Sequence, residues 1–351
     1  MIRGGFLLLA LAPAWAAVAA PPPVDPALPG YASAGSLQGE IVLARSASTQ
    51  TLVDAWIRGF AAFHPGVRLR QTDRATDLPA TCLAELLDGR VSVAPFVREI
   101  QPTELAAARA RLGYPPLGIA VASGSYATPS NTHAIAIYVN AANPLERITL
   151  AQLDAIYSTT RRRGCPADLT TWGQLGLAGP WTGRPIHRYG MVINRPSGNP
   201  HAGIVAYLME RLMLGGDFKP DTRQVPDTGM GRGKNHALDE IVRAVAADPA
   251  GIGYAGFANR LPGTRTLALA EAAGGPWYAG TRDEVARRVY PLTRTIFVFV
   301  RRPPGAPLDP ALAAFLRFIL SRQGQQAVAD DPANFLPLPA GFAAGERARL
   351  N

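Results

Sequence analysis

Residues 40–63 read EIVLARSASTQTLVDAWIRGFAAF, and they predict a buried strand, a polar loop and a helix in direct succession. The first five residues form a short apolar run of the length expected for a strand. From residue 51 onward, large apolar side chains recur at helical spacing, at Leu52, Trp56, Phe60 and Phe63. Ser48 and Thr49 stand where a helix N-cap is expected. A strand that runs into a helix in this way predicts the first part of a βαβ unit.

The same alternation continues along the chain. Further strands are predicted at 67–71, 91–94, 118–122, 133–139, 185–193, 252–255 and 295–300, and further helices at 81–87, 150–157, 204–212, 238–245 and 312–320. This rhythm predicts an α/β fold with parallel, doubly wound sheets. A chain of 351 residues exceeds the size at which single cores stop growing, so we expect two domains.

The N-terminus has the features of a secretory signal peptide. Arg3 supplies positive charge, residues 6–12 are apolar, and Ala17-Val18-Ala19 is a small-residue cleavage site. We therefore expect residues 1–19 to direct export to the periplasm. The apolar stretch is too short to span a membrane, which takes about 20 residues, and no later segment suffices. Residues 20–36 are rich in proline and alanine and predict a flexible leader.

The formal net charge of +9 suits an anionic ligand or an acidic partner, although scattered surface charge explains it equally simply. Nucleic acid is disfavoured by the export signal and by the absence of a recognition motif. Cys82 and Cys165 are the two cysteines. In an oxidising compartment they can form one disulfide, and two unpaired thiols are the alternative.

No pattern indicates an enzyme, a metal site or a cofactor. The histidines have no metal-binding spacing, and no Gly-x-Ser-x-Gly sequence occurs. The segment Gly229-Met230-Gly231-Arg232-Gly233-Lys234 lacks the spacing of a nucleotide phosphate loop, and Asn235 follows where serine or threonine is required.

Several short motifs carry a resemblance to a known family. The loop at residues 46–49 is followed, in order, by Val139-Asn140, Asn143-Pro144-Leu145, Ile148-Thr149-Leu150, the turn at 195–199, Gly251-Ile252-Gly253-Tyr254 and Tyr290-Pro291-Leu292-Thr293-Arg294. In this order the chain resembles the phosphate-binding subunit of bacterial ABC transporters. The resemblance implies two α/β lobes joined by hinge strands, a ligand cleft between them, and a monomer that meets an ABC permease. It places one lobe at 37–130 plus 290–345 and the other at 131–289.

The resemblance also implies which residues bind the anion. Ser46, Ser48 and Thr49 match the first phosphate loop, with an ordinary N-cap as the alternative. Ser197, Gly198 and Asn199 match a Ser-Gly-Thr turn of the family, and Arg195 takes the place of its guanidinium clamp. A glycine-containing turn that caps the next helix is the alternative for this stretch. Hydroxyls, helix N-termini and a bidentate arginine all present donors to an oxyanion.

Two positions depart from the family pattern. The second loop falls on Leu78-Pro79-Ala80-Thr81, which keeps the hydroxyl of Thr81 and loses the glycines. Ser92 stands at the position of the acidic residue that accepts the ligand proton. Arg98 matches an arginine slightly further on, or pairs with a nearby carboxylate. These changes leave open a non-transport role, as a sensor, interaction or secretion-associated protein.

Overall fold

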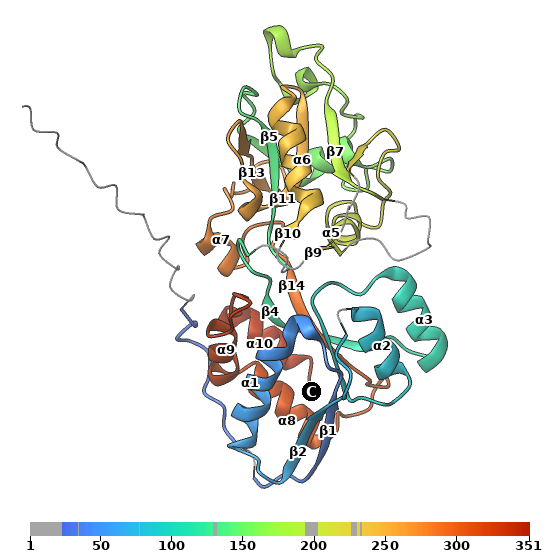
Figure 1. Cartoon of the computed structure of the whole chain (residues 1–351), viewed down its shortest axis with the longest axis vertical. Helices are drawn as coiled ribbons and strands as arrows, with labels where there is room; N and C mark the ends of the chain where they lie inside the picture. Colours follow the sequence, from blue (N-terminus) through green and yellow to red (C-terminus); the bar gives the residue numbers. More distant parts are fainter. Residues whose placement is uncertain are drawn as a thin grey trace, which may run out of the picture.

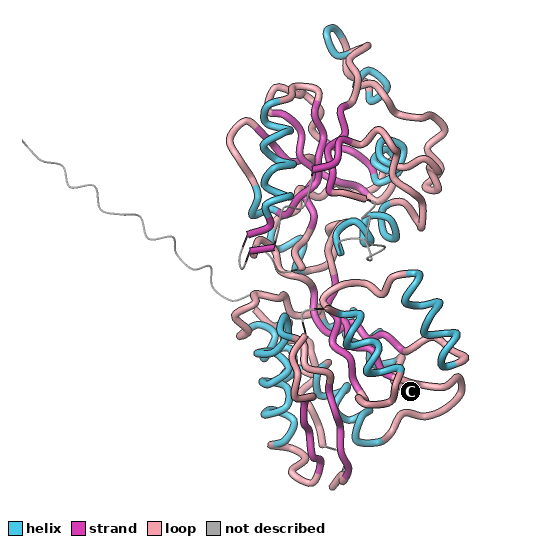
Figure 2. Tube along the Cα trace, turned by 45° about the vertical axis from the view of Figure 1, so that its right-hand side comes forward, coloured by secondary structure: helices cyan, strands magenta, loops and turns pink. Residues whose placement is uncertain are grey.

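The computed structural model describes residues 23–33, 35–76, 78–128, 132–193, 203–225, 230–231 and 234–351. Two lobes follow one another along its long axis, each built on a five-stranded sheet (Figures 1 and 2). Each lobe has its own buried apolar cluster, as expected for a chain too long for one core. The structure thus confirms the predicted two-lobed α/β fold.

The lower lobe in Figure 1 contains both ends of the described chain. Its sheet has the order β2-β1-β3-β14-β4. The strands are β1 (Gly39–Leu43), β2 (Val67–Gln71), β3 (Val93–Phe96), β4 (Leu117–Ser123) and β14 (Thr295–Val300). The helices are α1 (Gln50–Ala61), α2 (Pro79–Leu87), α3 (Pro102–Leu112), α8 (Pro310–Ile319), α9 (Arg322–Ala329) and α10 (Ala340–Ala348). Helix α1 packs on α8 and α9, while α2 packs on β3 and α3.

The upper lobe has a sheet with the order β12-β5-β11-β7-β8. Its strands are β5 (Ile135–Asn140), β7 (His187–Met191), β8 (Arg223–Val225), β11 (Gly251–Gly256) and β12 (Thr264–Thr266). Strands β6 (Arg147–Thr149) and β13 (Ala268–Ala270), and likewise β9 (Met230–Gly231) and β10 (Lys234–Asn235), form two-stranded sheets. The helices are α4 (Leu150–Tyr157), α5 (Gly203–Tyr207) with its π-helical continuation η4 (Leu208–Leu212), α6 (His236–Ala247) and α7 (Arg282–Ala286).

Both large sheets are mixed, so the prediction of parallel sheets was wrong in part. Strand β1 is parallel to β2 and β3, but β14 is antiparallel to both β3 and β4. Strand β14 enters its sheet from the other lobe, and it therefore runs opposite to β4, which ends towards that lobe (Figure 1). The direction of a strand depends on these long connections, which periodicity in the sequence cannot report.

The chain is expected to cross between the lobes twice, and the second crossing passes through residues 290–294. Tyr290 is buried and donates its hydroxyl to the carbonyl of Ile135 at 2.8 Å. The other predicted crossing, near Ser130, lies outside the described residues, but Thr132 just after it donates a hydrogen bond to the carbonyl of Val97. The exact lobe boundaries stay a prediction.

Residues 23–33 pack against the lower lobe, so the prediction of a flexible leader is wrong for this segment. Leu28 is fully buried, and the Nε of Arg322 donates to its carbonyl at 3.1 Å. The hydroxyl of Tyr31 lies 2.7 Å from the Nε2 of His64. The high proline and alanine content of this segment predicted a flexible leader and gave no indication that Leu28 and Tyr31 anchor it. The signal peptide lies outside the described residues, and within the described part no helix is long and apolar enough to cross a membrane.

Candidate functional site

The loop between β1 and α1 carries the first group of predicted ligand residues. It forms a short 3-10 helix, η1 (Ala47–Thr49), that runs directly into α1. The loop is fixed by Thr76, whose carbonyl accepts from the amide of Ala47 and whose amide donates to Arg45, both at 3.0 Å. Helix α1 starts at the end of the lower lobe that faces the upper lobe (Figure 1). The fold therefore holds this loop at the junction of the lobes.

The hydroxyl of Thr49 is buried without a partner. Thr49 is 2% exposed, and its Oγ1 accepts or donates no hydrogen bond within the described part of the chain. Ser46 is 8% exposed, and Ser48 is partly exposed. Neither Ser46 nor Thr49 makes a side-chain cap to the helix that follows it. The alternative of an ordinary side-chain N-cap is thus wrong for both residues.

An unpartnered hydroxyl at this place is suited to an anion. A buried polar group without a hydrogen bond costs about 1–3 kcal/mol, and such groups in native proteins need an explanation. The first amides of α1 have no partner within the helix, and the helix dipole places partial positive charge there. A bound oxyanion would accept hydrogen bonds from the hydroxyl and the amides together.

The second predicted loop is more exposed. Thr81 lies in the first turn of α2 with an exposed side chain, and its amide donates to the carbonyl of Leu78 at 2.9 Å. Leu78 itself is 65% exposed at the N-cap of α2. Without glycines, this helix start presents an apolar side chain to solvent.

Ser92 immediately precedes β3, and its amide donates to the carbonyl of Val42 at 2.7 Å. The match of Ser92 with the acidic residue of the family stays a prediction. The sequence predicted a strand at 91–94, whereas β3 is Val93–Phe96 and includes Pro95, opposite Val298. The position after this strand belongs to Val97 and Arg98.

The predicted residues of the upper lobe lie outside the described part of the chain: Arg195, Ser197, Gly198 and Asn199. The described chain resumes at Gly203, where α5 begins. A Cβ atom placed on Gly203 would lie 3.5 Å from the Cδ of Arg98 and 3.5 Å from a guanidinium nitrogen of Arg294. The start of α5 is therefore in contact with the lower lobe.

Arg98 forms a buried ion pair, which confirms the alternative given for it. Its two terminal nitrogens donate to the carboxylate oxygens of Glu104 at 2.7 and 2.6 Å. Glu104 also accepts from the backbone amide of Gln101 at the start of α3. A guanidinium held by both oxygens of one carboxylate has little capacity left to clamp a ligand.

Sequence reasoning missed Arg294 as a functional residue. It is 6% exposed, it donates to Glu99 at 3.2 Å and to the carbonyl of Gly203 at 3.4 Å, and it lies over the ring of Tyr207. Its Nε is buried and has no hydrogen-bond partner within the described residues. Arg294 thus joins the lobes. A charged residue directly ahead of the apolar strand TIFVFV was the available signal.

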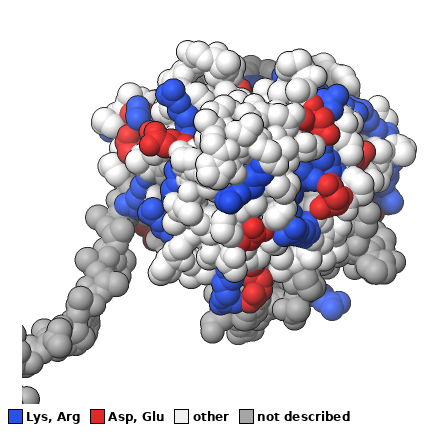
Figure 3. All heavy atoms as spheres, turned by 90° about the horizontal axis from the view of Figure 1, so that it is seen from above, with Lys and Arg blue, Asp and Glu red and all other residues white. Residues whose placement is uncertain are grey.

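The described residues also show how surface charge, metal-binding side chains and cysteines are distributed. Acidic and basic side chains are interspersed over the end of the upper lobe seen from above (Figure 3). The described residues include no cluster of metal-binding side chains. Cys82 and Cys165 are both free thiols, so the disulfide considered from the sequence is not formed. Cys82 belongs to α2 in the lower lobe, whereas Cys165 packs against the core of the upper lobe.

Comparison with known proteins identifies the family. A family model described as a PBP superfamily domain matches residues 31–323. The chain belongs to the PBP superfamily. It is a divergent PstS-like member, because it is 31% identical over 319 residues to the phosphate-binding protein PstS of Pseudomonas aeruginosa PAO1, covering 90% of this chain and 88% of the relative. PstS of strain UCBPP-PA14 matches equally. The crystal structure of PstS from Borrelia burgdorferi has the same fold, with a TM-score of 0.51 and 15% identity over 86% of this chain and 99% of that one.

Proposed function

We propose that this PBP superfamily member captures inorganic phosphate between its lobes and delivers it to an ABC-type importer. The observation that carries the proposal is the buried hydroxyl of Thr49 at the start of α1, which has no hydrogen-bond partner within the described residues. The similarity to proteins named as phosphate-binding supports it. It acts as a binding protein and not as an enzyme.

The lower lobe supplies the first donors, from the hydroxyls of Ser46, Ser48 and Thr49 and the free amides of α1. The predicted turn at residues 195–199 supplies the donors of the upper lobe, including the guanidinium of Arg195. Phosphate first binds one lobe, and rotation about the crossings completes the set of donors. Thr81 lies too exposed to be a principal ligand, and Ser92 is left out because it precedes its strand.

The proposed setting follows from the same function. Residues 1–19 direct the chain to the periplasm, where the loaded monomer meets a permease of the inner membrane. Closure of the lobes marks the loaded state for that partner.

Isothermal titration calorimetry of the mature protein, freed of ligand by unfolding and refolding, tests the proposal. We expect phosphate to bind with micromolar or tighter affinity and sulfate to compete when added in excess, because no acidic residue matches the proton acceptor of the family. Absence of heat with phosphate would contradict the proposal and favour the non-transport role.

A further inference from the structure

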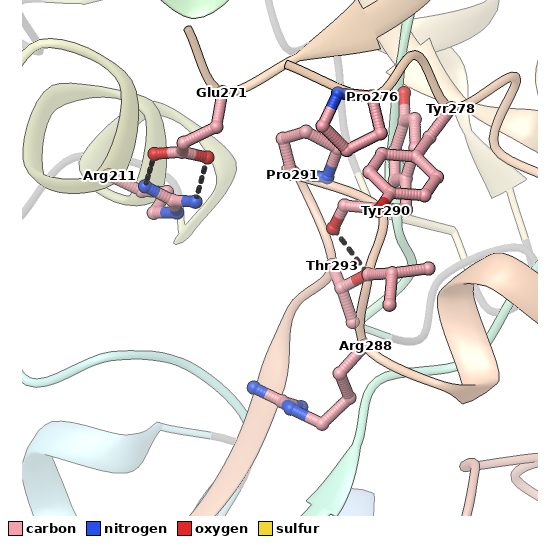
Figure 4. Close-up of a pocket in the computed structure, with 9 residues that line it drawn as sticks. Arg211, Glu271, Pro276, Tyr278, Arg288, Tyr290, Pro291 and Thr293 are labelled. Atoms are coloured by element: carbon pink, nitrogen blue, oxygen red, sulfur yellow. Dashed lines mark hydrogen bonds and ion pairs between the residues drawn. The ribbon is translucent and has the colours of Figure 1, made fainter.

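A cavity of about 220 Å³ lies beside the second crossing (Figure 4). Residues of the upper lobe and of the crossing itself form its walls: Arg211, Glu271, Pro276, Tyr278, Val289, Tyr290, Pro291 and Thr293. Arg288 lines its lower side, and its guanidinium lies beside the start of β14 (Figure 4). With a share of about 30 Å³ for each water in the liquid, the cavity has room for roughly seven waters or one small organic molecule.

Arg288 connects the end of α7 to the sheet of the lower lobe. Its terminal nitrogens donate to the Oγ of Ser123 and the Oγ1 of Thr295, both at 2.8 Å. These two residues face each other across β4 and β14. The guanidinium carbon also lies 4.1 Å from the ring centroid of Phe342. Both hydrogen-bond partners are neutral, and unused N–H donors remain.

The charge of Arg288 is not compensated by a carboxylate. Within the described part of the chain, Arg288 takes part in no ion pair, and burial lowers its pKa. Glu99 and Glu346 act on it at longer range. Each has another partner, since Glu99 accepts from Arg294 at 3.2 Å and Glu346 from Arg349 at 2.7 Å. A half-buried cation in this situation gains from a bound anion.

The backbone of Arg288 adds an independent observation. Its φ is 58°, in the left-handed region, directly after the C-cap residue Arg287 of α7. Glycine is the usual residue at this place after a helix, and a larger residue costs about 1–2 kcal/mol there. A side chain that is kept at such a cost indicates a function for it.

The cavity adjoins the contact between Arg294 and Gly203. The carbonyl of Thr293, which lines the cavity, accepts from the hydroxyl of Tyr207 at 3.0 Å, and Arg294 lies over the ring of Tyr207. The two arginines differ in their partners: Arg294 pairs with Glu99, whereas Arg288 donates to Ser123 and Thr295.

We propose that this cavity is a second anion site that binds a small organic monocarboxylate. The carboxylate accepts from the free N–H groups of Arg288, and the ring of Tyr278 with the lining prolines contacts the apolar body. Arg211 and Glu271 form a bidentate ion pair, at 2.9 and 2.6 Å, and Arg163 also donates to Glu271 at 3.2 Å. These side chains and the guanidinium of Arg288 leave the wall positive, which suits a carboxylate. The site uses none of the residues proposed to bind phosphate and does not depend on phosphate binding.

Calorimetry with benzoate as the probe and benzamide as its neutral counterpart tests the site in the full mature chain. We expect benzoate to bind in the presence of saturating phosphate and benzamide not to bind. Arg288→Gly removes the guanidinium and suits the left-handed backbone, and it should weaken benzoate at least about tenfold. Arg287→Ala removes the neighbouring exposed charge and should leave benzoate affinity within about twofold. Equal benzoate binding by wild type and Arg288→Gly, displacement of benzoate by phosphate, or no benzoate binding would overturn the proposal.

A measurement on the wild-type protein avoids any effect of the substitution on folding. Phenylglyoxal modifies accessible arginine side chains, and peptide mass spectrometry locates the modified residues. We expect benzoate to protect Arg288 and not Arg287. Equal modification of Arg288 with and without benzoate would contradict the proposed contact.

Discussion

Replacement of Thr49 by valine separates the stability of the protein from its affinity for phosphate. The two side chains have nearly the same shape, and the substitution removes only the hydroxyl. In the structure this hydroxyl is buried at 2% exposure without a partner in the described chain. An unsatisfied buried polar group costs about 1–3 kcal/mol, so Thr49→Val should stabilise the ligand-free protein by about 1 kcal/mol.

The same substitution should weaken phosphate binding. A hydrogen bond to a charged group contributes about 1.5–3 kcal/mol, which corresponds to about a tenfold to hundredfold change in the dissociation constant. The predicted effects therefore have opposite signs: the ligand-free protein becomes more stable while the complex becomes weaker. A merely structural role for Thr49 produces no such opposition.

Urea unfolding of the ligand-free protein and calorimetric titration with phosphate measure the two effects. Thr51→Val is the matched control, because the Oγ1 of Thr51 donates to a carboxylate oxygen of Asp331 at 2.7 Å. That variant should lose stability and keep its phosphate affinity. A destabilised Thr49→Val protein with unchanged phosphate affinity would refute the assignment of Thr49 to the site.

Three further changes test the fold around the site. Leu28→Ala should destabilise the protein by about 2–4 kcal/mol in urea unfolding, because Leu28 is fully buried; a value near zero would restore the flexible-leader interpretation. Glu104→Gln should cost about 3 kcal/mol, since it leaves the guanidinium of Arg98 buried without its bidentate carboxylate, and an unchanged unfolding midpoint would show that the pair is dispensable. Thiol titration of the native protein at pH 8 should detect Cys165 and not Cys82, because burial raises the pKa of the Cys82 thiol to about 12; after unfolding, both should react, and reaction of neither would reveal a disulfide.

Local patterns predicted the elements that form within a short stretch of chain. The strand expected at 40–44 is β1 (Gly39–Leu43), and the helix expected at 51–63 is α1 (Gln50–Ala61). Both follow from periodicity, since the large apolar residues of α1 face the core of the lower lobe. Phe63, which was included in the predicted helix, lies beyond the end of α1 and is half-exposed. The loop between them was predicted for the same reason.

Features that depend on distant parts of the chain were not predictable in this way. Leu28 is buried because α8, α9 and α10 form a surface about 300 residues later in the sequence. The extent of β3 depends on β14, which pairs with residues 93–96 and so includes Pro95 in the strand. The partners of Arg294 come from two distant segments, the stretch after β3 and helix α5, so no local pattern marks it as a contact between the lobes.

The described charges around the junction of the lobes bear on how a phosphate would be recognised. Arg98 is neutralised by Glu104, and Arg294 by Glu99. Each pair is neutral, so together they bring no net charge to the junction. Their role is to hold the start of α5 and the end of β3 in place. The lower lobe then offers the anion the hydroxyl of Thr49 and the amides at the start of α1, next to the guanidinium of Arg45, which donates to Gln50. Donors with fixed directions favour a ligand with the matching oxygen geometry. The arginines at the junction are paired with carboxylates, whereas Arg288 beside it takes part in no ion pair within the described residues. The two proposed sites therefore differ in their chemistry.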